Sequence, residues 1–262
     1  MKFITSIGFA FIALTGCYAQ SIPGSQPLGK SGLFNEILFH GKKYFVCEVN
    51  PHHYKIEVFN RREDGAGIYD LNTLAVVKKD ELLLVMNGGM YQQDMRPVGL
   101  LVSNGKTYHE LNLNVNGKGN FHELSPNGIF MLDSLNTPFV LTTGKYISGN
   151  YTPWLATQSG PMLVIDGVFN SHFKKGSANL NIRNGAGVNK KGNVVLVVSE
   201  EPVNFYELAE LYRDILNCNN ALYLDGFVSQ YYAPELHEKP KAGYPLAVFI
   251  TVSKHSLTAH DQ

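Results

Sequence analysis

Short apolar segments separated by turn residues recur along this chain, and they constrain its fold more than any other feature. Segments of this length, rich in β-branched and aromatic residues and bounded by Gly, Asn or Asp, are typical of β-strands. The predicted strands are 44–49, 54–59, 82–86, 98–102, 128–132, 138–142, 162–165, 194–199, 221–224 and 246–252. Asn104-Gly105 and Asp166-Gly167 each predict a tight hairpin turn, because these residues tolerate positive φ.

One segment has clear helical periodicity. Asn204 can cap it, Glu207 follows three residues later, and apolar residues recur at helical spacing up to Leu216. Asn217 would end this helix in the left-handed conformation, and a weaker helix is predicted over 70–79. The chain is therefore predicted to be α+β, with mostly antiparallel or mixed sheet and one or two helices packed on it. The order is also compatible with a degenerate two-half duplication.

The first 19 residues predict an export signal. An apolar run over 3–14 follows Lys2 and is too short to span a bilayer comfortably. Cys17 ends a lipobox-like LTGC, which predicts lipidation of this residue and membrane attachment; cleavage after Ala19 by an ordinary signal peptidase is the alternative. Both alternatives predict an exported protein, either periplasmic or anchored to the outer membrane.

The rest of the chain divides into two parts. Residues 20–32 are rich in Gly, Pro, Ser and Gln, which predicts a flexible tether, and 33–262 are predicted to form a single domain.

The composition is that of a globular and electrically balanced protein. Hydrophobic residues make up 44% and charged residues 17%, with 22 basic and 22 acidic side chains. Without a net positive field or a basic run, nucleic acid is not an expected partner. Cys47 and Cys218 lie in apolar contexts and are predicted to be two separate buried thiols, although an exported protein could join them.

Four segments place glycines and polar residues next to apolar strands: 87–91, 157–161, 181–188 and 223–229. At such strand ends the backbone can approach a ligand closely, and polar side chains lie at the rim of a sheet. Each segment alone is compatible with a tight turn, but the four together predict a site.

These segments belong to an ordered set of seven motifs. The motifs are NGGMY, PVGLLVSNG, GNFHELSPNGIF, ATQSGPMLVIDG, NIRNGAGV, NFYELAELYRD and ALYLDGFVS. In this order, over roughly residues 40–252, the chain resembles the phosphodiester glycosidase family of N-acetylglucosamine-1-phosphodiester α-N-acetylglucosaminidase, and in particular its exported bacterial branch. The resemblance implies a hydrolase that releases a sugar from a phosphodiester.

The resemblance also implies a set of site residues. It places in one pocket the residues Asn87, Gln158, Ser159, Arg183, Asp225 and Ser229, and we add the neighbouring Gly88 and Asn184 as substrate-binding residues. Many members have Leu-Asp-Gly-Gly-Gly-Ser where this chain has Phe227 and Val228 in place of two glycines.

Two of these residues fit the chemistry of a sugar phosphodiester. Arg183 has a planar set of donors that can bind two phosphate oxygens; a structural role is the alternative. Asp225 follows an apolar strand and could act as a nucleophile or stabilise positive charge at the anomeric carbon; the alternative is an ordinary turn-capping Asp.

The second carboxylate is less defined by the sequence. Glu200 is preferred over Glu201, Glu123 and Asp166, and a phosphate leaving group reduces the need for a general acid. A divalent metal beside Asp225 is compatible with phosphate chemistry, although no spacing in the sequence requires one.

Two other functions remain open at this point. A phosphodiesterase of the cell envelope would break the P–O bond and release a sugar phosphate. A non-catalytic lipoprotein would use the same pocket to bind an envelope glycan or a nucleotide sugar.

Overall fold

The computed structural model describes residues 24–60, 71–77, 81–114, 119–225, 229–237, 239 and 245–255. The predicted export segment with Cys17 lies outside these residues, as do positions 226–228 with Phe227 and Val228. None of the helices in the described part of the chain is long and apolar enough to cross a membrane.

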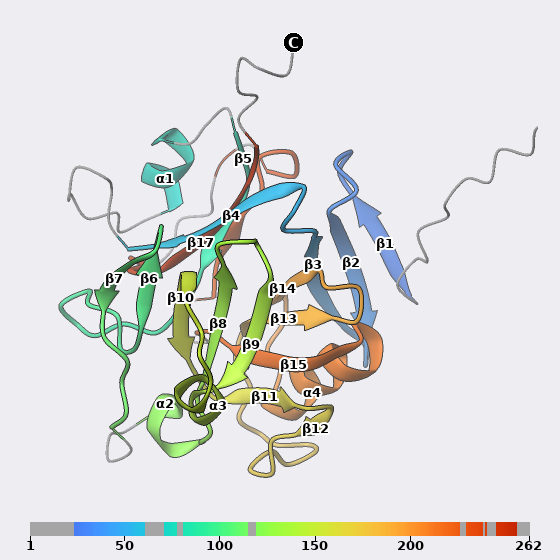
Figure 1. Ribbon diagram of the computed structural model, residues 1–262. Coiled ribbons are helices and arrows are strands. Elements are labelled where there is room, and N and C mark those ends of the chain that lie inside the picture. The colour runs from blue at the N-terminus through green and yellow to red at the C-terminus, as the bar shows by residue number, and fades with distance from the viewer. Residues whose placement is uncertain are drawn as a thin grey trace, which may run out of the picture.

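The largest sheet has eight strands, which come from the N-terminal part of the described chain and from residues 162–223, and it includes the predicted strand 194–199 (Figure 1). Its order is β1 (Ser25–Leu28), β2 (Phe34–Phe39), β3 (Lys42–Val49), β14 (Val194–Ser199), β13 (Asn184–Asn189), β15 (Cys218–Tyr223), β11 (Met162–Ile165) and β12 (Val168–Phe169).

Two smaller sheets pack against one face of the large one. The five-stranded sheet has the order β7 (Lys106–His109), β6 (Leu101–Ser103), β10 (Pro153–Ser159), β8 (Gly128–Asp133) and β9 (Pro138–Thr142). The four-stranded sheet has the order β16 (Tyr231–Tyr232), β5 (Leu82–Asn87), β17 (Phe249–Lys254) and β4 (Tyr54–Phe59). Every pairing between described strands is antiparallel, which confirms the predicted α+β class.

The helices are short. They are α1 (Leu71–Val77), α2 (Asn120–Glu123), α3 (Thr143–Ser148) and α4 (Phe205–Glu210), which continues into a π-helical turn, η1 (Leu211–Ile215). The predicted capping box is present, because Asn204 and Glu207 each accept a hydrogen bond from the other's backbone N–H. Asn217 has the predicted left-handed conformation, with φ of 55°.

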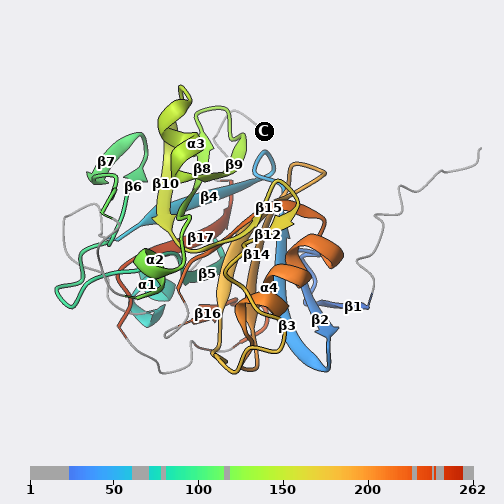
Figure 2. The same ribbon diagram turned by 90° about the horizontal axis from the view of Figure 1, so that it is seen from below.

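The large sheet is buried on both faces. Along β14, Leu196 and Val198 point toward the smaller sheets, whereas Val195 and Val197 point toward α4 and η1. Figure 2 shows these helices on the outer side of the sheet, opposite the smaller sheets. A strand buried on both faces has a continuous apolar sequence, as VVLVVS does, because neither face can carry polar side chains.

The glycine-rich segment 181–188 is not the tight turn with which its sequence alone is compatible. Strand β13 occupies most of it and lies in the middle of the large sheet, between β14 and β15. A Cβ at Gly187 would lie 2.9 Å from two ring atoms of Tyr212, and one at Gly185 would lie 2.8 Å from the carbonyl oxygen of Leu222. The glycines are therefore required by packing, because the buried Tyr212 ring lies directly over this strand.

The predicted flexible tether is wrong for its described residues. Ser25–Leu28 forms β1, which pairs with β2 at the edge of the large sheet. After β1, the carboxylate of Glu235 accepts hydrogen bonds from the backbone N–H groups of Lys30 and Ser31. The composition of this Gly- and Pro-containing segment does not predict a strand; the segment forms one because it pairs with the edge of the sheet.

Both predicted hairpins are confirmed. Asn104-Gly105 joins β6 to β7 with φ of 49° and 71°, and Asp166-Gly167 joins β11 to β12 with φ of 50° and 81°. Positive φ at both central residues is the type I′ pattern, whose twist matches that of the strands. The two cysteines of the described chain, Cys47 and Cys218, are free and buried, as predicted, and burial raises the pKa of both thiols.

Candidate active site

Polar residues at the ends of strands from different sheets meet around Asp225. Asn87 ends β5, Asn184 begins β13, and Asp225 lies two residues after β15. The Nδ2 of Asn184 donates to the carbonyl oxygen of Asn87 at 2.7 Å and to its Oδ1 at 3.0 Å. The Oδ1 of Asn184 accepts from the backbone N–H of Asp225 at 2.8 Å. Both asparagines are fully buried, so this junction fixes the position of Asp225 rigidly.

The backbone on both sides of Asp225 is also held by serine hydroxyls. Ser159, at the end of β10, donates to the carbonyl oxygen of Leu224, and Ser229 donates to that of Asp225, both at 2.5 Å. The N–H of Gln230 donates to the Oδ1 of Asn87 at 2.9 Å. Four of the predicted site residues, Asn87, Ser159, Asn184 and Ser229, therefore surround Asp225, which is also a predicted site residue.

Tyr91 is an electrostatic neighbour of Asp225. Burial, and secondly the negative charge of Asp225, raise the pKa of Tyr91 to about 12. Its hydroxyl group donates to the carbonyl oxygen of Pro245 at 2.5 Å. Asp225 is 9% exposed, so it is largely withdrawn from water.

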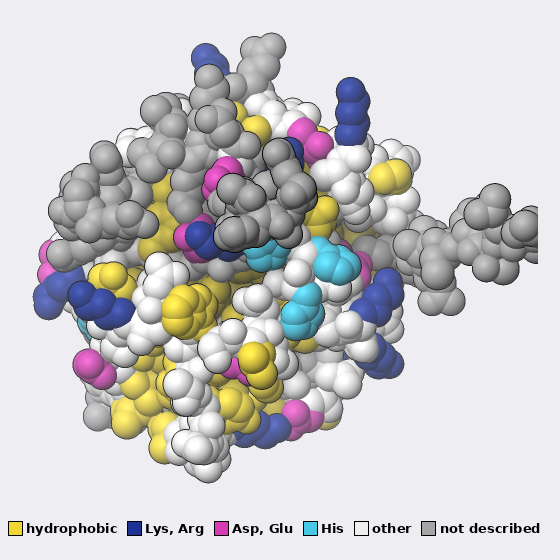
Figure 3. All heavy atoms as spheres, turned by 45° about the horizontal axis from the view of Figure 1, so that its top comes forward, with side chains coloured by type: hydrophobic (Ala, Val, Ile, Leu, Met, Phe, Trp, Pro, Cys, Tyr) yellow, Lys and Arg dark blue, Asp and Glu magenta, His cyan; other side chains and the backbone are white. Residues whose placement is uncertain are grey.

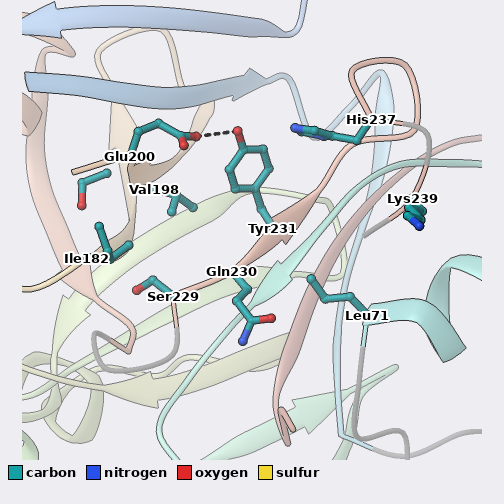
Figure 4. Close-up of a pocket in the computed structure, with 10 residues that line it drawn as sticks. Leu71, Ile182, Val198, Glu200, Ser229, Gln230, Tyr231, His237 and Lys239 are labelled. Atoms are coloured by element: carbon teal, nitrogen blue, oxygen red, sulfur yellow. Dashed lines mark hydrogen bonds between the residues drawn. The ribbon is translucent and has the colours of Figure 1, made fainter. Parts of the chain in front are cut away.

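A pocket of about 190 Å³ lies next to Ser229. Its walls are Leu71, Ile182, Val198, Ser199, Glu200, Ser229, Gln230, Tyr231, His237 and Lys239 (Figure 4). Two of the predicted site residues, Ser229 and Glu200, are part of it. The residues Ser229 and Gln230 thus connect the pocket with the junction at Asp225.

Glu200 is held at the pocket wall by Tyr231. The hydroxyl group of Tyr231 donates to the Oε1 of Glu200 at 2.6 Å, as the dashed line in Figure 4 marks. The Tyr231 ring is stacked on Phe45, with centroids 4.0 Å apart. Burial, and secondly this hydrogen bond, raise the pKa of Tyr231. Tyr231 therefore stays neutral and acts as a donor to the carboxylate.

Arg183 does not meet the expectation that it binds phosphate. Its side chain is 0% exposed, on the face of the large sheet that carries α4. Its Nε donates to the carbonyl oxygen of Val203 at 2.8 Å, and Nη2 donates to the carbonyl oxygen and the Oδ1 of Asn179, both at 3.1 Å. The guanidinium lies 3.6 Å from the ring centroid of Phe205. Arg183 is thus a structural residue, and burial lowers its pKa.

Gln158 and Gly88 also have structural roles. The Oε1 of Gln158 accepts from the backbone N–H groups of Leu100 and Asn112, and its Nε2 donates to the carbonyl oxygen of Asn112 at 2.9 Å. These bonds join the segments before β6 and after β7 to β10. A Cβ at Gly88 would lie 2.7 Å from the Ile250 side chain, so this glycine permits close contact between β5 and β17.

The other carboxylates considered from the sequence lie in local structures. Asp166 forms an ion pair with Lys145 at 2.6 Å in its hairpin turn, and Glu123 accepts from the backbone N–H of Gly119 at 3.1 Å beside α2. Within the described residues, no three His, Cys, Asp or Glu side chains come together as metal ligands. The divalent metal therefore stays a prediction without a ligand set.

The sequence did not single out Gln230, His237 and Lys239 as site residues. They follow the Asp225 motif within fourteen residues, and proximity to that motif is the one signal that could have found them.

On the face drawn in Figure 3, basic and acidic side chains are interspersed with hydrophobic ones. Recognition of an anion therefore depends on a local group of side chains.

Residues 80–251 match the family model described as phosphodiester glycosidase, and this range contains the junction and nearly the whole pocket. The chain belongs to the phosphodiester glycosidase family. This family member is 33% identical over 212 residues to Uncharacterized protein YigE of Escherichia coli (strain K12), covering 79% of this chain and 80% of that one.

Two solved structures share the fold of this phosphodiester glycosidase family member. The catalytic domain of zebrafish N-acetylglucosamine-1-phosphodiester α-N-acetylglucosaminidase, auto-inhibited by its pro-peptide, has a TM-score of 0.59 at 16% identity. The similarity covers 91% of this chain and 85% of that one. A hypothetical protein from Synechocystis has a TM-score of 0.54 at 14% identity, covering 85% of this chain and 62% of that one.

Proposed function

We propose that this chain hydrolyses a sugar-1-phosphodiester and releases the free sugar, with Asp225 acting at the anomeric carbon. The observation that carries the proposal is the junction of buried side chains that fixes Asp225 from both sides. Preorganised charge stabilises a transition state better than mobile charge, because no reorganisation is required during the reaction. Family membership and the name of the zebrafish enzyme support the same reaction class.

The reaction breaks the bond between the anomeric carbon and the bridging oxygen. The electron pair of this bond leaves with the phosphate, and water supplies the hydroxyl group of the free sugar. Asp225 either attacks the anomeric carbon or stabilises its developing positive charge. Because a phosphate leaves as a weak base, protonation of the leaving group contributes less than in ordinary glycoside cleavage.

Glu200 is the proposed second carboxylate. It lies at the wall of the pocket that Ser229 shares with the Asp225 junction, and its position is fixed by Tyr231. In this position Glu200 can exchange a proton with water or a substrate hydroxyl group.

We also propose that the protein acts outside the cytoplasm. The support is the sequence of residues 1–19, in which Cys17 is lipidated or Ala19 precedes the cleavage site. The natural substrate would then be a sugar phosphodiester or a glycan of the cell envelope.

Product analysis tests the proposed reaction. The protein is incubated with sugar-1-phosphodiesters, including N-acetylglucosamine-1-phosphodiesters and nucleotide sugars, and free sugar and sugar phosphate are assayed separately. We expect free sugar, and a decrease of about a thousandfold in kcat for Asp225→Asn. Asp214→Asn is the matched control, since Asp214 forms an exposed pair with Arg213 on η1.

Three results would contradict the proposal in different ways. Sugar phosphate as the product would move the cut to the P–O bond. Unchanged activity of Asp225→Asn would remove Asp225 from the mechanism. Ligand binding without any product would favour the non-catalytic binding protein.

A further inference from the structure

We propose that the pocket lined by Ser229 and Glu200 binds the phosphate-bearing group that leaves in the reaction, with Lys239 contacting its phosphate and Glu200 contacting a hydroxyl group. This inference rests on the proposed function, because cleavage at the anomeric carbon leaves the phosphate on the departing group. The ligand class is therefore a phosphate monoester of a sugar or polyol.

The pocket is in the right place for this group. Ser229 lines the pocket while its hydroxyl donates to the backbone of Asp225, and the Gln230 backbone donates to Asn87 in the junction. A substrate whose anomeric carbon lies at Asp225 would therefore extend past Ser229 into the pocket. In Figure 4 the Ser229 and Gln230 side chains lie beside this space.

The pocket has an exposed cation at its wall that a phosphate can contact. Lys239 lines it and forms no ion pair with any residue that the structure describes. Arg183, which the sequence favoured for this task, is buried on the other face of the large sheet. His237 lies between Lys239 and Tyr231 along the chain, and its ring meets the Tyr231 ring edge-on at 5.4 Å. Among the lining residues that the structure describes, Lys239 is thus the one lysine or arginine available to an anion.

A fixed hydrogen-bond acceptor lies across the pocket. Glu200 and Lys239 are on opposite sides in Figure 4. One carboxylate oxygen of Glu200 accepts from Tyr231, and a carboxylate has further acceptor capacity for ligand hydroxyl groups. Separation of cation and carboxylate favours a ligand with phosphate at one end and hydroxyl groups at the other.

The size and the remaining walls agree with a small ligand. The pocket has a volume of about 190 Å³. This volume suits glycerol phosphate or one phosphorylated sugar ring. Ile182 and Val198 on the Glu200 side and Leu71 on the Lys239 side are apolar (Figure 4), and the carbon atoms of such a ligand can pack against them.

Calorimetry with matched ligands tests the inference on the full chain. Glucose 6-phosphate and glucose differ by the phosphate alone, and glycerol 3-phosphate with glycerol forms a second pair. We expect Lys239→Ala to weaken binding of both phosphate esters about tenfold and Lys239→Arg to restore most of it. Lys190→Ala, in the exposed β13–β14 turn, should leave the affinity unchanged.

A second variant tests the hydroxyl-binding side. Tyr231→Phe keeps the ring that stacks on Phe45 and removes the hydroxyl group that holds Glu200. We expect it to weaken binding of glycerol 3-phosphate severalfold and to leave binding of inorganic phosphate unchanged.

The outcomes separate the subsite from the reaction. Failure of the wild type to bind any of these phosphate esters at millimolar concentrations, or equal affinities of wild type and Lys239→Ala, would overturn the inference. Binding that depends on Lys239 without turnover of any diester would retain the subsite and refute the hydrolase. Turnover of a diester, with product inhibition that is the same in wild type and Lys239→Ala, would support the hydrolase and refute the subsite.

Discussion

Replacement of Asn184 by alanine tests whether the buried junction at Asp225 holds the sheets together. The substitution removes three hydrogen bonds, two to Asn87 and one from the N–H of Asp225. At about 1 kcal/mol each, their loss lowers the free energy of unfolding by about 3 kcal/mol. The N–H of Asp225 also loses this acceptor within a buried site, so the loss should not be smaller.

Urea denaturation measures this loss. For a chain of this size the dependence of the unfolding free energy on urea is about 3 kcal/mol per M. The midpoint should therefore fall by about 1 M at an unchanged slope. Asn219→Ala is the matched control: Asn219 lies on the same large sheet, in β15, but is exposed, so its loss should stay within about 0.5 kcal/mol.

A double-mutant cycle gives the result that would refute the reasoning. Asn87→Ala removes the partner of Asn184 on β5, so the two substitutions together should cost less than the sum of each alone, by about 1–2 kcal/mol. Additive effects, or a loss for Asn184→Ala no larger than that of the control, would show that the junction does not couple the two sheets.

Three further predictions follow from individual residues. Arg183→Lys keeps the charge but not the planar donors, so stability should fall by about 2 kcal/mol while KM for a phosphodiester stays unchanged; a raised KM at unchanged stability would restore the phosphate role. Gly187→Ala should lower stability by about 1–3 kcal/mol through overpacking, whereas Gly144→Ala, with no atoms within 4 Å of the added Cβ, should not; equal melting temperatures of the two variants would contradict this. Asp225→Asn should lower the pKa of Tyr91 from about 12, measured by NMR of labelled tyrosines, and an unchanged value would refute their proximity. Because this pKa lies above the ordinary 10.0, the contribution of Tyr91 to stability is present below pH 10 and is lost as the pH rises toward 12.

Many local features of the fold could be predicted from the sequence because local interactions determine them. The helix at Asn204 begins with the side-chain capping that its residues dictate. The turn at Asn104-Gly105 requires two residues that accept positive φ. The strands 54–59, 138–142, 162–165 and 194–199 have the bounds that their apolar composition predicts.

Other elements depended on contacts between segments that are distant in the sequence. Ser25–Leu28 is a strand because the edge of β2 offers it hydrogen bonds. Gly185 and Gly187 lie in a central strand because Tyr212 occupies the space that side chains would need. Strand β10 carries Thr157, Gln158 and Ser159, and these polar residues are buried because other segments supply their partners.

The candidate site shows the same division. In the sequence, polar residues beside glycines at strand ends marked the segments. The family resemblance implied Asn87, Asp225 and Ser229, and Asn184 was added as a neighbouring residue; the structure brings these four together. Only the tertiary structure decided which polar residues face the site. Arg183 is adjacent to Asn184, yet successive residues of a strand point to opposite faces, so Arg183 is buried beneath α4. Lys239, from a later segment, lies in the pocket. The direction of a side chain depends on the sheet around it, and that sheet is assembled from strands throughout the chain.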